Sequence, residues 1–272
     1  MEDTLLIEQV KQIRQEHPSL GVRKLYLKLQ PFMQTHNIKL GRDGLFSLLS
    51  AHNLLIRKRK RRIQTTQSLH RFKKYPNQIK DFVATSANQL WVSDITYFPL
   101  ADKYCYISLI TDAYSHKIVG YQVGESLAAV ESIKALRMAL SGLCALKSHA
   151  KLIHHSDRGI QYCSDEYIKL LESHQISISM TQDGDPRENA IAERVNGIIK
   201  EEYLAHYALT TIQQAKATLD RVVELYNSDR PHMSIGNLSP NEIHHGEETI
   251  QVTKLWKNYY REKLSLVNQL QD

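Results

Sequence analysis

The sequence predicts an α/β protein in which a mixed five-stranded sheet is flanked by helices. Between residues 85 and 205, short runs rich in β-branched and aromatic residues alternate with stretches whose apolar residues recur every three or four positions. The first 56 residues show helical periodicity alone. The predicted organisation is therefore a small helical domain (1–56), a basic linker (57–84), the α/β core (85–205) and C-terminal helices (206–272).

Composition favours a polyanionic partner, because the 272 residues carry a net charge of +6 and the pI is near 9.0. No apolar run approaches the roughly 20 residues that span a bilayer, so no membrane contact is expected. The first residues include acids and lack a basic stretch, which argues against a secretory signal. The isolated Cys105, Cys144 and Cys163 predict no zinc site or disulfide framework, which fits a reducing cytoplasm.

The N-terminal 56 residues predict three short helices. Leu6, Val10 and Ile13 lie on one face of the first, the second runs from Gly21 to Leu29, and the third starts near Asp43. Short helices joined by glycine-containing turns suit a helix-turn-helix-like unit. A helical packing subdomain explains the same residues equally well.

The linker is the clearest charge feature. From Gly44 to Lys80 the chain has no acidic residue, and adjacent cations repel one another unless an anion lies alongside. We therefore expect this segment to track the DNA backbone. A solvated basic linker that only improves solubility is the alternative. The cations expected to contact DNA are Arg57, Lys58, Arg59, Lys60, Arg61, Arg62, Lys73 and Lys74.

The core predicts strands and helices in the order β-β-β-α-β-α-β-α. The first three strands are separated by very short turns, which indicates an antiparallel meander. Strands one and four should neighbour each other, with the site at the strand ends. The strands are expected at 90–100, 104–111, 117–123, 151–155 and 175–180, with helices over 130–140 and 165–173 and a last helix after Pro186.

Three acids stand out in this order. Asp94 lies within the first strand, Asp157 follows the fourth, and Glu193 lies on the last helix. On that helix Ile191, Val195 and Ile198 form an apolar stripe. Three carboxylates brought together repel one another, and a divalent cation relieves that repulsion. The polar face of the same helix carries Asn189, Glu193, Asn196 and Lys200.

Other polar residues have simpler interpretations. Asp112 is expected to serve a turn, and His154 and His155 a structural or outer-sphere role, because they lack zinc-ligand spacing. His244 and His245 are expected in a solvated loop. After the core, a helix is expected over 212–226, then a loop broken by Pro231, Gly236 and Pro240, then a final helix from Val252 to Leu266.

These segments together resemble the transposases of bacterial insertion sequences in the group-three family, whose core is of the retroviral-integrase (DDE) type. Asp157 and Glu193 are separated by 35 residues, the spacing typical of that group, and Lys200 follows seven residues after Glu193. Two positions depart from the family pattern, Glu188 where Asp is usual and Arg194 where Ser is frequent. The matching segments are HPSLGVRKLYLKL, WVSDITYF, TDAYSHKIVGY, HHSDRGIQYCS, AERVNGIIKEE and YNSDRPHMSIGNLSPNEI.

The resemblance implies an RNase H-like core and a DNA transposase that cleaves element ends and transfers strands. It implies that Asp94, Asp157 and Glu193 are catalytic and hold two Mg²⁺ or Mn²⁺ ions, and that Lys200 contacts a DNA phosphate. It further implies double-stranded element ends and target DNA as partners, a homo-oligomer on DNA, fusion to a first-frame helix-turn-helix product, and a place in the bacterial cytoplasm at the nucleoid. Two alternatives remain open: an RNase H-like nuclease without strand transfer, and a catalytically inert DNA-binding regulator of transposition.

Overall fold

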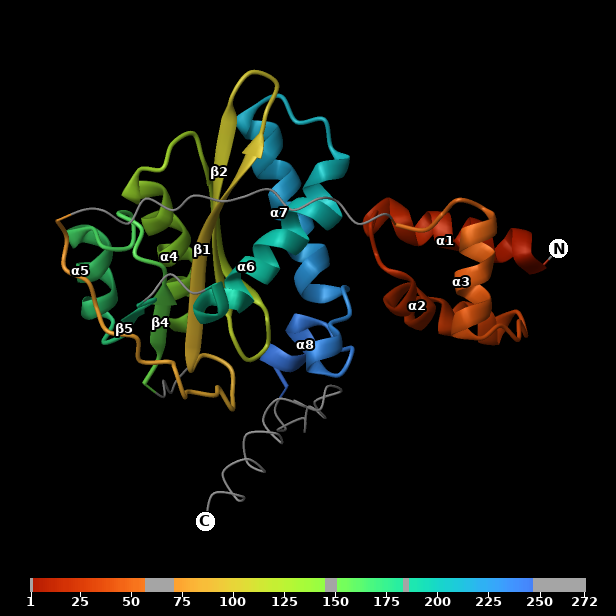
Figure 1. The fold of residues 1–272 in the computed structure, drawn as a ribbon, viewed down its shortest axis with the longest axis horizontal. Helices are drawn as coiled ribbons and strands as arrows, with labels where there is room; N and C mark the ends of the chain where they lie inside the picture. The colour runs from red at the N-terminus through yellow and green to blue at the C-terminus, as the bar shows by residue number, and fades with distance from the viewer. Residues whose placement is uncertain (1, 57–70, 145–150, 183–185, 247–272) are drawn as a thin grey trace, which may run out of the picture.

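The computed structural model describes residues 2–56, 71–144, 151–182 and 186–246. Its centre is a five-stranded sheet in the order β3-β2-β1-β4-β5, with helices on both faces (Figure 1). The strands are β1 (Leu90–Pro99), β2 (Tyr104–Asp112), β3 (Ile118–Gly124), β4 (Ile153–Ser156) and β5 (Ser177–Met180).

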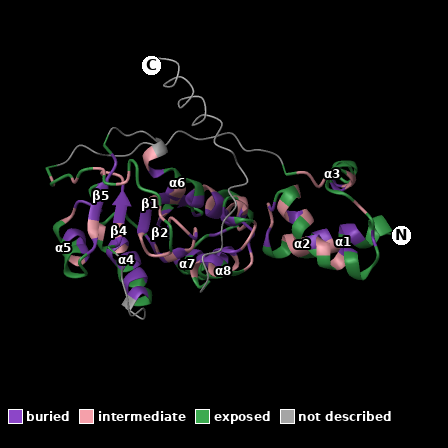
Figure 2. Cartoon of the chain, turned by 90° about the horizontal axis from the view of Figure 1, so that it is seen from below, coloured by how far each residue is buried: buried purple, intermediate pink, exposed green. Residues whose placement is uncertain are grey.

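The strand directions confirm the mixed sheet that the sequence predicts. β1, β2 and β3 form an antiparallel meander, while β4 pairs in parallel with both β1 and β5. Parallel neighbours need crossover connections, and the helices before β4 and β5 supply them. β1 is the central strand, so its residues are buried by layers on both faces (Figure 2).

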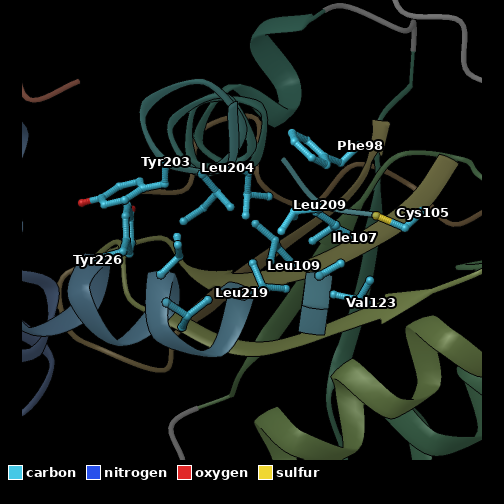
Figure 3. Close-up of a cluster of buried hydrophobic side chains, with 14 of the residues drawn as sticks. Phe98, Cys105, Ile107, Leu109, Val123, Tyr203, Leu204, Leu209, Leu219 and Tyr226 are labelled. Carbon is cyan, nitrogen blue, oxygen red and sulfur yellow. The ribbon is translucent and has the colours of Figure 1, made fainter. Parts of the chain in front are cut away.

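Each face of the sheet has its own apolar core. Helices α4 (Ala129–Cys144) and α5 (Asp165–Ser173) cover one face, where they enclose Trp91 and Ile110. Helices α6 (Ala190–Gly197) and α7 (Ile212–Ser228) cover the other. Figure 3 shows this second core, in which Tyr203 and Leu204 face the strand residues Ile107 and Leu109 from one side and α7 closes it from the other.

The N-terminal helices form a separate cluster beside the core (Figure 1). They are α1 (Glu2–Glu16), α2 (Val22–Thr35) and α3 (Arg42–Ala51). Their apolar residues pack on one another and not on the sheet. Helix α2 continues through Pro31, beyond the predicted end at Leu29. Polar contacts join this cluster to the core, through His17 and Lys28 on one side and Asp229 on the other.

The helix that carries Glu193 is more irregular than its periodicity predicts. A 3₁₀ turn (Pro186–Asn189) leads into α6, and a π-helical turn (Ile198–Tyr203) and a second 3₁₀ turn (Leu204–His206) follow it. Wider π turns are frequent at functional sites. Lys200 lies within the π turn.

The segment after α7 contains a helix where the sequence suggests a loop. Pro240 starts α8 (Pro240–His244), because a proline is tolerated in a first turn, where no N–H is needed. Ser239 and Glu242 form a capping box there, and Thr211 and Gln214 form another at the start of α7. The helix expected from Val252 to Leu266 lies outside the described residues.

The end of the basic linker runs beside the edge strand β5. The Gln78 N–H donates to Ser179 Oγ at 2.9 Å, and Gln78 Nε2 donates to the Ile178 carbonyl at 2.9 Å. The Met180 N–H donates to the Pro76 carbonyl at 3.4 Å. These bonds cover a strand edge that would otherwise be open to pairing with another chain. In the described part of the chain, no helix has the length and apolar character to cross a bilayer.

Close contact between β3 and α4 predicts a stability effect at Gly120. A Cβ there would lie 2.3 Å from the Ala135 carbonyl oxygen, so Gly120→Ala should lower the free energy of unfolding by about 1–3 kcal/mol or more. Gly142 lies in α4, where an added Cβ would meet nothing within 4 Å, so Gly142→Ala should be neutral or stabilising by about 0.5–1 kcal/mol. Urea denaturation measures the free energy of unfolding of both variants. Equal effects of the two substitutions would contradict the close packing of β3 against α4 at Gly120.

Candidate active site

The strand register brings Asp94 and Asp157 together. In the parallel pair β1–β4, the last matched residues are Ser93 and Ser156. Asp94 directly follows Ser93, and Asp157 directly follows Ser156. Neighbouring strands lie about 4.8 Å apart. The two carboxylates are therefore neighbours where β4 ends. This is the strand-end position that the sequence predicts.

Helix α6 and the π turn lie along β1, and residues four apart on the helix face residues two apart on the strand. Four helical residues advance about 6 Å and two strand residues about 6.6 Å, so the two repeats match closely. Glu193 is carried on the exposed side of this helix, one turn before the contact with Asp94. The facing pairs are Ala192 with Val92, Asn196 with Asp94, and Lys200 with Thr96.

Asp94 is the most perturbed carboxylate of the site. Its side chain is buried, with 8% of the residue exposed. Oδ1 accepts from the Ile95 N–H at 2.8 Å, and Oδ2 accepts from Asn196 Nδ2 at 2.8 Å. Burial is the largest cause that raises the pKa of Asp94 to about 7, and the negative charges of Asp157 and Glu193 add to it. The two hydrogen bonds oppose the rise without cancelling it.

Asp157 is held by a tight turn. Its Oδ1 accepts from the Gly159 N–H at 2.9 Å, so the carboxylate folds back over its own backbone. A Cβ on Gly159 would lie 2.9 Å from that same oxygen and 2.9 Å from Gln161 Oε1. Glycine therefore leaves the space into which the Asp157 carboxylate fits.

The three acids are of the ligand type that a hard divalent cation takes. Each of the other two carboxylates raises the pKa of Asp94, so both are close enough to repel it. Oxygen ligands of this kind suit Mg²⁺ or Mn²⁺. The buried Oδ1 atoms of Asn189 and Asn196 have no hydrogen-bond partner among the described residues, and such acceptors suit metal-bound water. Within the described ranges, no three His, Cys, Asp or Glu side chains are arranged closely enough to hold an ion.

Two buried amides fasten the helix to β1, and sequence reasoning placed them only on a polar face. Asn189 Nδ2 donates to the Ser93 carbonyl at 3.0 Å, four residues before Glu193, and Asn196 bonds Asp94 three residues after it. Both amides are nearly inaccessible. Their spacing of seven residues, two helical turns, is the signal in the sequence that could have identified them as a pair facing the sheet.

The remaining predicted residues occupy distinct environments. Lys200 Nζ donates to Thr96 Oγ1 at 3.2 Å and lies 4.6 Å from the centre of the Tyr97 ring. Lys73 and Lys74 are exposed, and Lys73 Nζ lies 4.8 Å from the centre of the Tyr75 ring. The run from Arg57 to Arg62 falls outside the described residues.

Behind Asp94, a buried histidine organises a polar network. His154 Nε2 lies 2.7 Å from Ser93 Oγ and 2.9 Å from the Tyr167 hydroxyl. Burial lowers the pKa of His154 to about 3 and that of His155 to about 4, so both rings are neutral near pH 7. His155 Nδ1 contacts Ser179 Oγ at 2.8 Å. These contacts agree with the structural role expected from the sequence.

Asp112 has the structural role that its position predicts. Its carboxylate accepts from the Asn88 N–H at 2.7 Å and from the Ser115 N–H at 2.8 Å. Ser115 Oγ also lies 2.9 Å from His244 Nδ1, which ties α8 to the β2–β3 turn. The expectation that His244 is solvated is therefore wrong, because 8% of its side chain is exposed.

Two family matches cover most of the catalytic region. The integrase core domain family matches residues 84–186, and a second integrase core domain family matches residues 174–240. A chain of the simian T-cell lymphotropic virus intasome, solved by cryo-EM in complex with the PP2A regulatory subunit B56 gamma, has a TM-score of 0.51 and 15% identity. The likeness covers 87% of this chain and 75% of that chain. It supports the predicted RNase H-like fold.

Curated relatives extend the match along the chain. A 31 kDa protein of insertion element IS600 from Shigella sonnei is 35% identical over 215 residues, which cover 78% of each chain. The transposase of IS629 from Shigella sonnei is 27% identical over 241 residues, covering 88% of this chain and 79% of the relative. Transposase InsF of IS3A from Escherichia coli K12 is 32% identical over 165 residues, covering 60% of this chain and 56% of the relative. The chain therefore belongs to the IS3-family transposases of bacterial insertion sequences, polynucleotidyl transferases with an integrase-type catalytic core.

Proposed function

We propose that this transposase cleaves element ends and transfers strands at a metal site held by Asp94, Asp157 and Glu193. The observation that carries the proposal is geometric: the parallel register of β1 and β4 next to Asp94 and Asp157, and the bond from Asn196 of α6 to Asp94. The raised pKa of Asp94, caused by burial and by the charges of the other two acids, supports it. Two Mg²⁺ or Mn²⁺ ions bound there would activate the attacking oxygen and stabilise the leaving 3′-oxygen of a phosphodiester. Named transposases among the relatives favour this activity over a nuclease or an inert regulator.

The chain's own groups have separate tasks in this proposal. Asp94 must lose its proton to act as a ligand, and Asn196 holds one of its oxygens in place. The turn through Gly159 orients Asp157, and α6 carries Glu193 to the same strand end. Lys200, next to Thr96 on β1, contacts a DNA phosphate near the site as a point charge on a flexible stem.

Partners and domain limits follow as further proposals. DNA binding is expected of the family, and the DNA here is the double-stranded element ends and the target. A homo-oligomer holds the two ends together. The basic residues 57–62, together with Lys73 and Lys74, contact the DNA. Fusion to a first-frame helix-turn-helix product would supply end recognition, and the nucleoid would be the place of action. We retain the limits 1–56, 57–84, 85–205 and 206–272, supported by the separate apolar cluster of α1–α3.

Removing the charge of Glu193 is the direct test of the site. Glu193→Gln should abolish Mg²⁺-dependent cleavage and strand transfer on labelled element ends, because a neutral amide cannot complete the acidic ligand set. DNA binding should remain within about twofold. The assay compares this chain alone with the fused two-frame protein. Cleavage that persists in both preparations would rule out Glu193 as a ligand, and metal-dependent nicks without joined products would favour the nuclease.

Gly159→Ala tests the placement of Asp157 without changing any charge. The added Cβ would overlap Asp157 Oδ1, so the carboxylate must move. We expect strand cleavage to fall at least tenfold, with a higher Mg²⁺ requirement and a nearly unchanged melting temperature. Gly142→Ala, in a position with free space around it, is the control. If Gly159→Ala cleaves DNA at the same rate as the wild type, the turn does not position Asp157.

The raised pKa of Asp94 predicts that the metal-free site destabilises the fold at neutral pH. Above pH 4 the unfolded carboxyl is ionised while the folded one still holds its proton, so stability is lost as the pH rises toward about 7. In EDTA, Asp94→Asn should therefore be more stable than the wild type at pH 8, by up to about 4 kcal/mol at 1.4 kcal/mol per pKa unit, and the gain should shrink toward pH 5.

Asp112→Asn provides the control of opposite sign. Burial would raise the pKa of Asp112, but bonds from His244 and Ser115 outweigh it and lower that pKa. Its ionised form therefore stabilises the fold at pH 8, and the amide should destabilise it. Melting temperatures from pH 5 to pH 8 measure both variants. Destabilisation by Asp94→Asn throughout that range would contradict the electrostatic repulsion at the site.

A further inference from the structure

The seam between the N-terminal helices and the core consists of polar contacts around Asp229. His17 Nε2 lies 2.6 Å from Asp229 Oδ2, and Lys28 Nζ lies 2.6 Å from the same oxygen. On the other side of the ring, His17 Nδ1 lies 2.8 Å from the Tyr203 hydroxyl. The buried apolar residues of α1–α3 and of the core fall in separate clusters. Hydrogen bonds and charge therefore hold the two together, in the part of the chain that the structure describes.

The neighbours of His17 fix which ring nitrogen donates. Only 1% of His17 is exposed, and burial lowers the pKa of its ring against the pull of Asp229 and Glu16, so the ring is neutral near pH 7. A carboxylate can only accept, so Nε2 carries the proton and donates to Asp229. Nδ1 is then the acceptor, and the Tyr203 hydroxyl donates to it. One imidazole thus links Asp229 to Tyr203.

Tyr203 connects this ring to the helix that carries Glu193. It is the last residue of the π turn, which continues α6 without a break. Its ring belongs to the apolar core under that segment, while Figure 3 shows its hydroxyl pointing away from Leu204 and Leu209. Tyr203 is 1% exposed, so its hydroxyl would be left buried and without its acceptor if His17 were removed.

Arg230, the residue after Asp229, holds the same turn from the core side. It is wholly buried, and it donates from Nε to Glu202 Oε2 at 3.0 Å and from Nη2 to Glu202 Oε1 at 2.9 Å. Such a two-pronged pair fixes both partners in orientation. The end of the π turn is thus held at two consecutive residues. Three segments that carry the family resemblance meet here, namely HPSLGVRKLYLKL, AERVNGIIKEE and YNSDRPHMSIGNLSPNEI.

We propose that His17 is a positioning residue for strand cleavage, because it holds the end of the segment that carries Glu193 and Lys200. Tyr203 lies ten residues after Glu193 and three after Lys200 on one continuous helical segment. A rigid element of this kind transmits a shift at its end to the groups along it. The N-terminal helices thereby support the catalytic core through a single ring. The inference rests on the proposed function, since it takes Glu193 and Lys200 as the groups to be positioned.

Two variants of His17 separate its two bonds. An Asn side chain places an oxygen near the position of Nδ1, and a Gln side chain places an amide nitrogen near that of Nε2. His17→Asn therefore keeps an acceptor for Tyr203, whereas His17→Gln keeps only a donor to Asp229. In single-turnover cleavage at saturating element-end duplex, His17→Gln should be about tenfold slower than the wild type and His17→Asn within about threefold. Both should bind the duplex in EDTA like the wild type.

Amide hydrogen exchange in EDTA gives a second readout that needs no cleavage. His17→Gln should speed exchange at the backbone amides of residues 193–203, because the end of the segment loses its hold, and His17→Asn should not. Tyr203→Phe keeps the ring and removes only the hydroxyl, so it should behave like His17→Gln in both assays. The double variant with His17→Gln should lose no more than either single one, because both remove the same bond.

Tyr26→Phe is the matched control. The Tyr26 hydroxyl donates to the Leu40 carbonyl at 3.3 Å, a bond within the N-terminal helices. The same chemical change there should leave both cleavage and exchange at wild-type values. Equal losses in His17→Asn and His17→Gln, or in Tyr26→Phe and Tyr203→Phe, would reduce the effect to general destabilisation and overturn the proposal. Wild-type cleavage by His17→Gln would overturn it as well, whatever the exchange.

The two readouts keep this proposal separate from the assignment of the catalytic acids. If Glu193→Gln still cleaves DNA, the acid assignment fails, and the exchange data still show whether His17 holds the segment. If Glu193→Gln is inactive while the His17 and Tyr203 variants match the wild type in both assays, the acids remain catalytic and the positioning role of His17 is wrong.

Discussion

The site depends on one helix lying along one strand with a matched repeat. Contacts at Val92, Asp94 and Thr96 meet every fourth residue of α6 and the turn after it, so the helix cannot slide without losing all three. Asn189 and Asn196 fix that register by bonding the backbone and side chain of β1. Everything proposed for Glu193 and Lys200 follows from this docking, because both are carried on the docked segment.

The docking of α6 places the carboxylate of Asp94 in a buried position close to two other carboxylates, where its negative charge is unfavourable. Burial and two neighbouring carboxylates raise the pKa of Asp94 to about 7, so part of the fold's stability is given up at neutral pH. A divalent cation bound at the acids would relieve this repulsion.

Much of this was accessible from the sequence. Alternating apolar residues and short turns predicted the antiparallel meander, and the order of elements predicted Asp94 within the first strand and Asp157 just past the end of the neighbouring fourth strand. Periodicity did not reveal which side of the last helix meets the sheet, so Asn189 and Asn196 were assigned only to a polar face. The π turn after Gly197 has no simple sequence signal, and the seam at Asp229 joins residues about 200 positions apart. Such pairings are set by tertiary packing.

The most direct test of the account is a crystal structure of this chain grown with Mn²⁺ and an element-end duplex, with the ions located by their anomalous scattering. We expect manganese to be bound by Asp94 together with Asp157 and Glu193, two ions in each site, and none there in Glu193→Gln. Manganese bound away from these three acids, or occupancy unchanged by Glu193→Gln, would contradict the central claim.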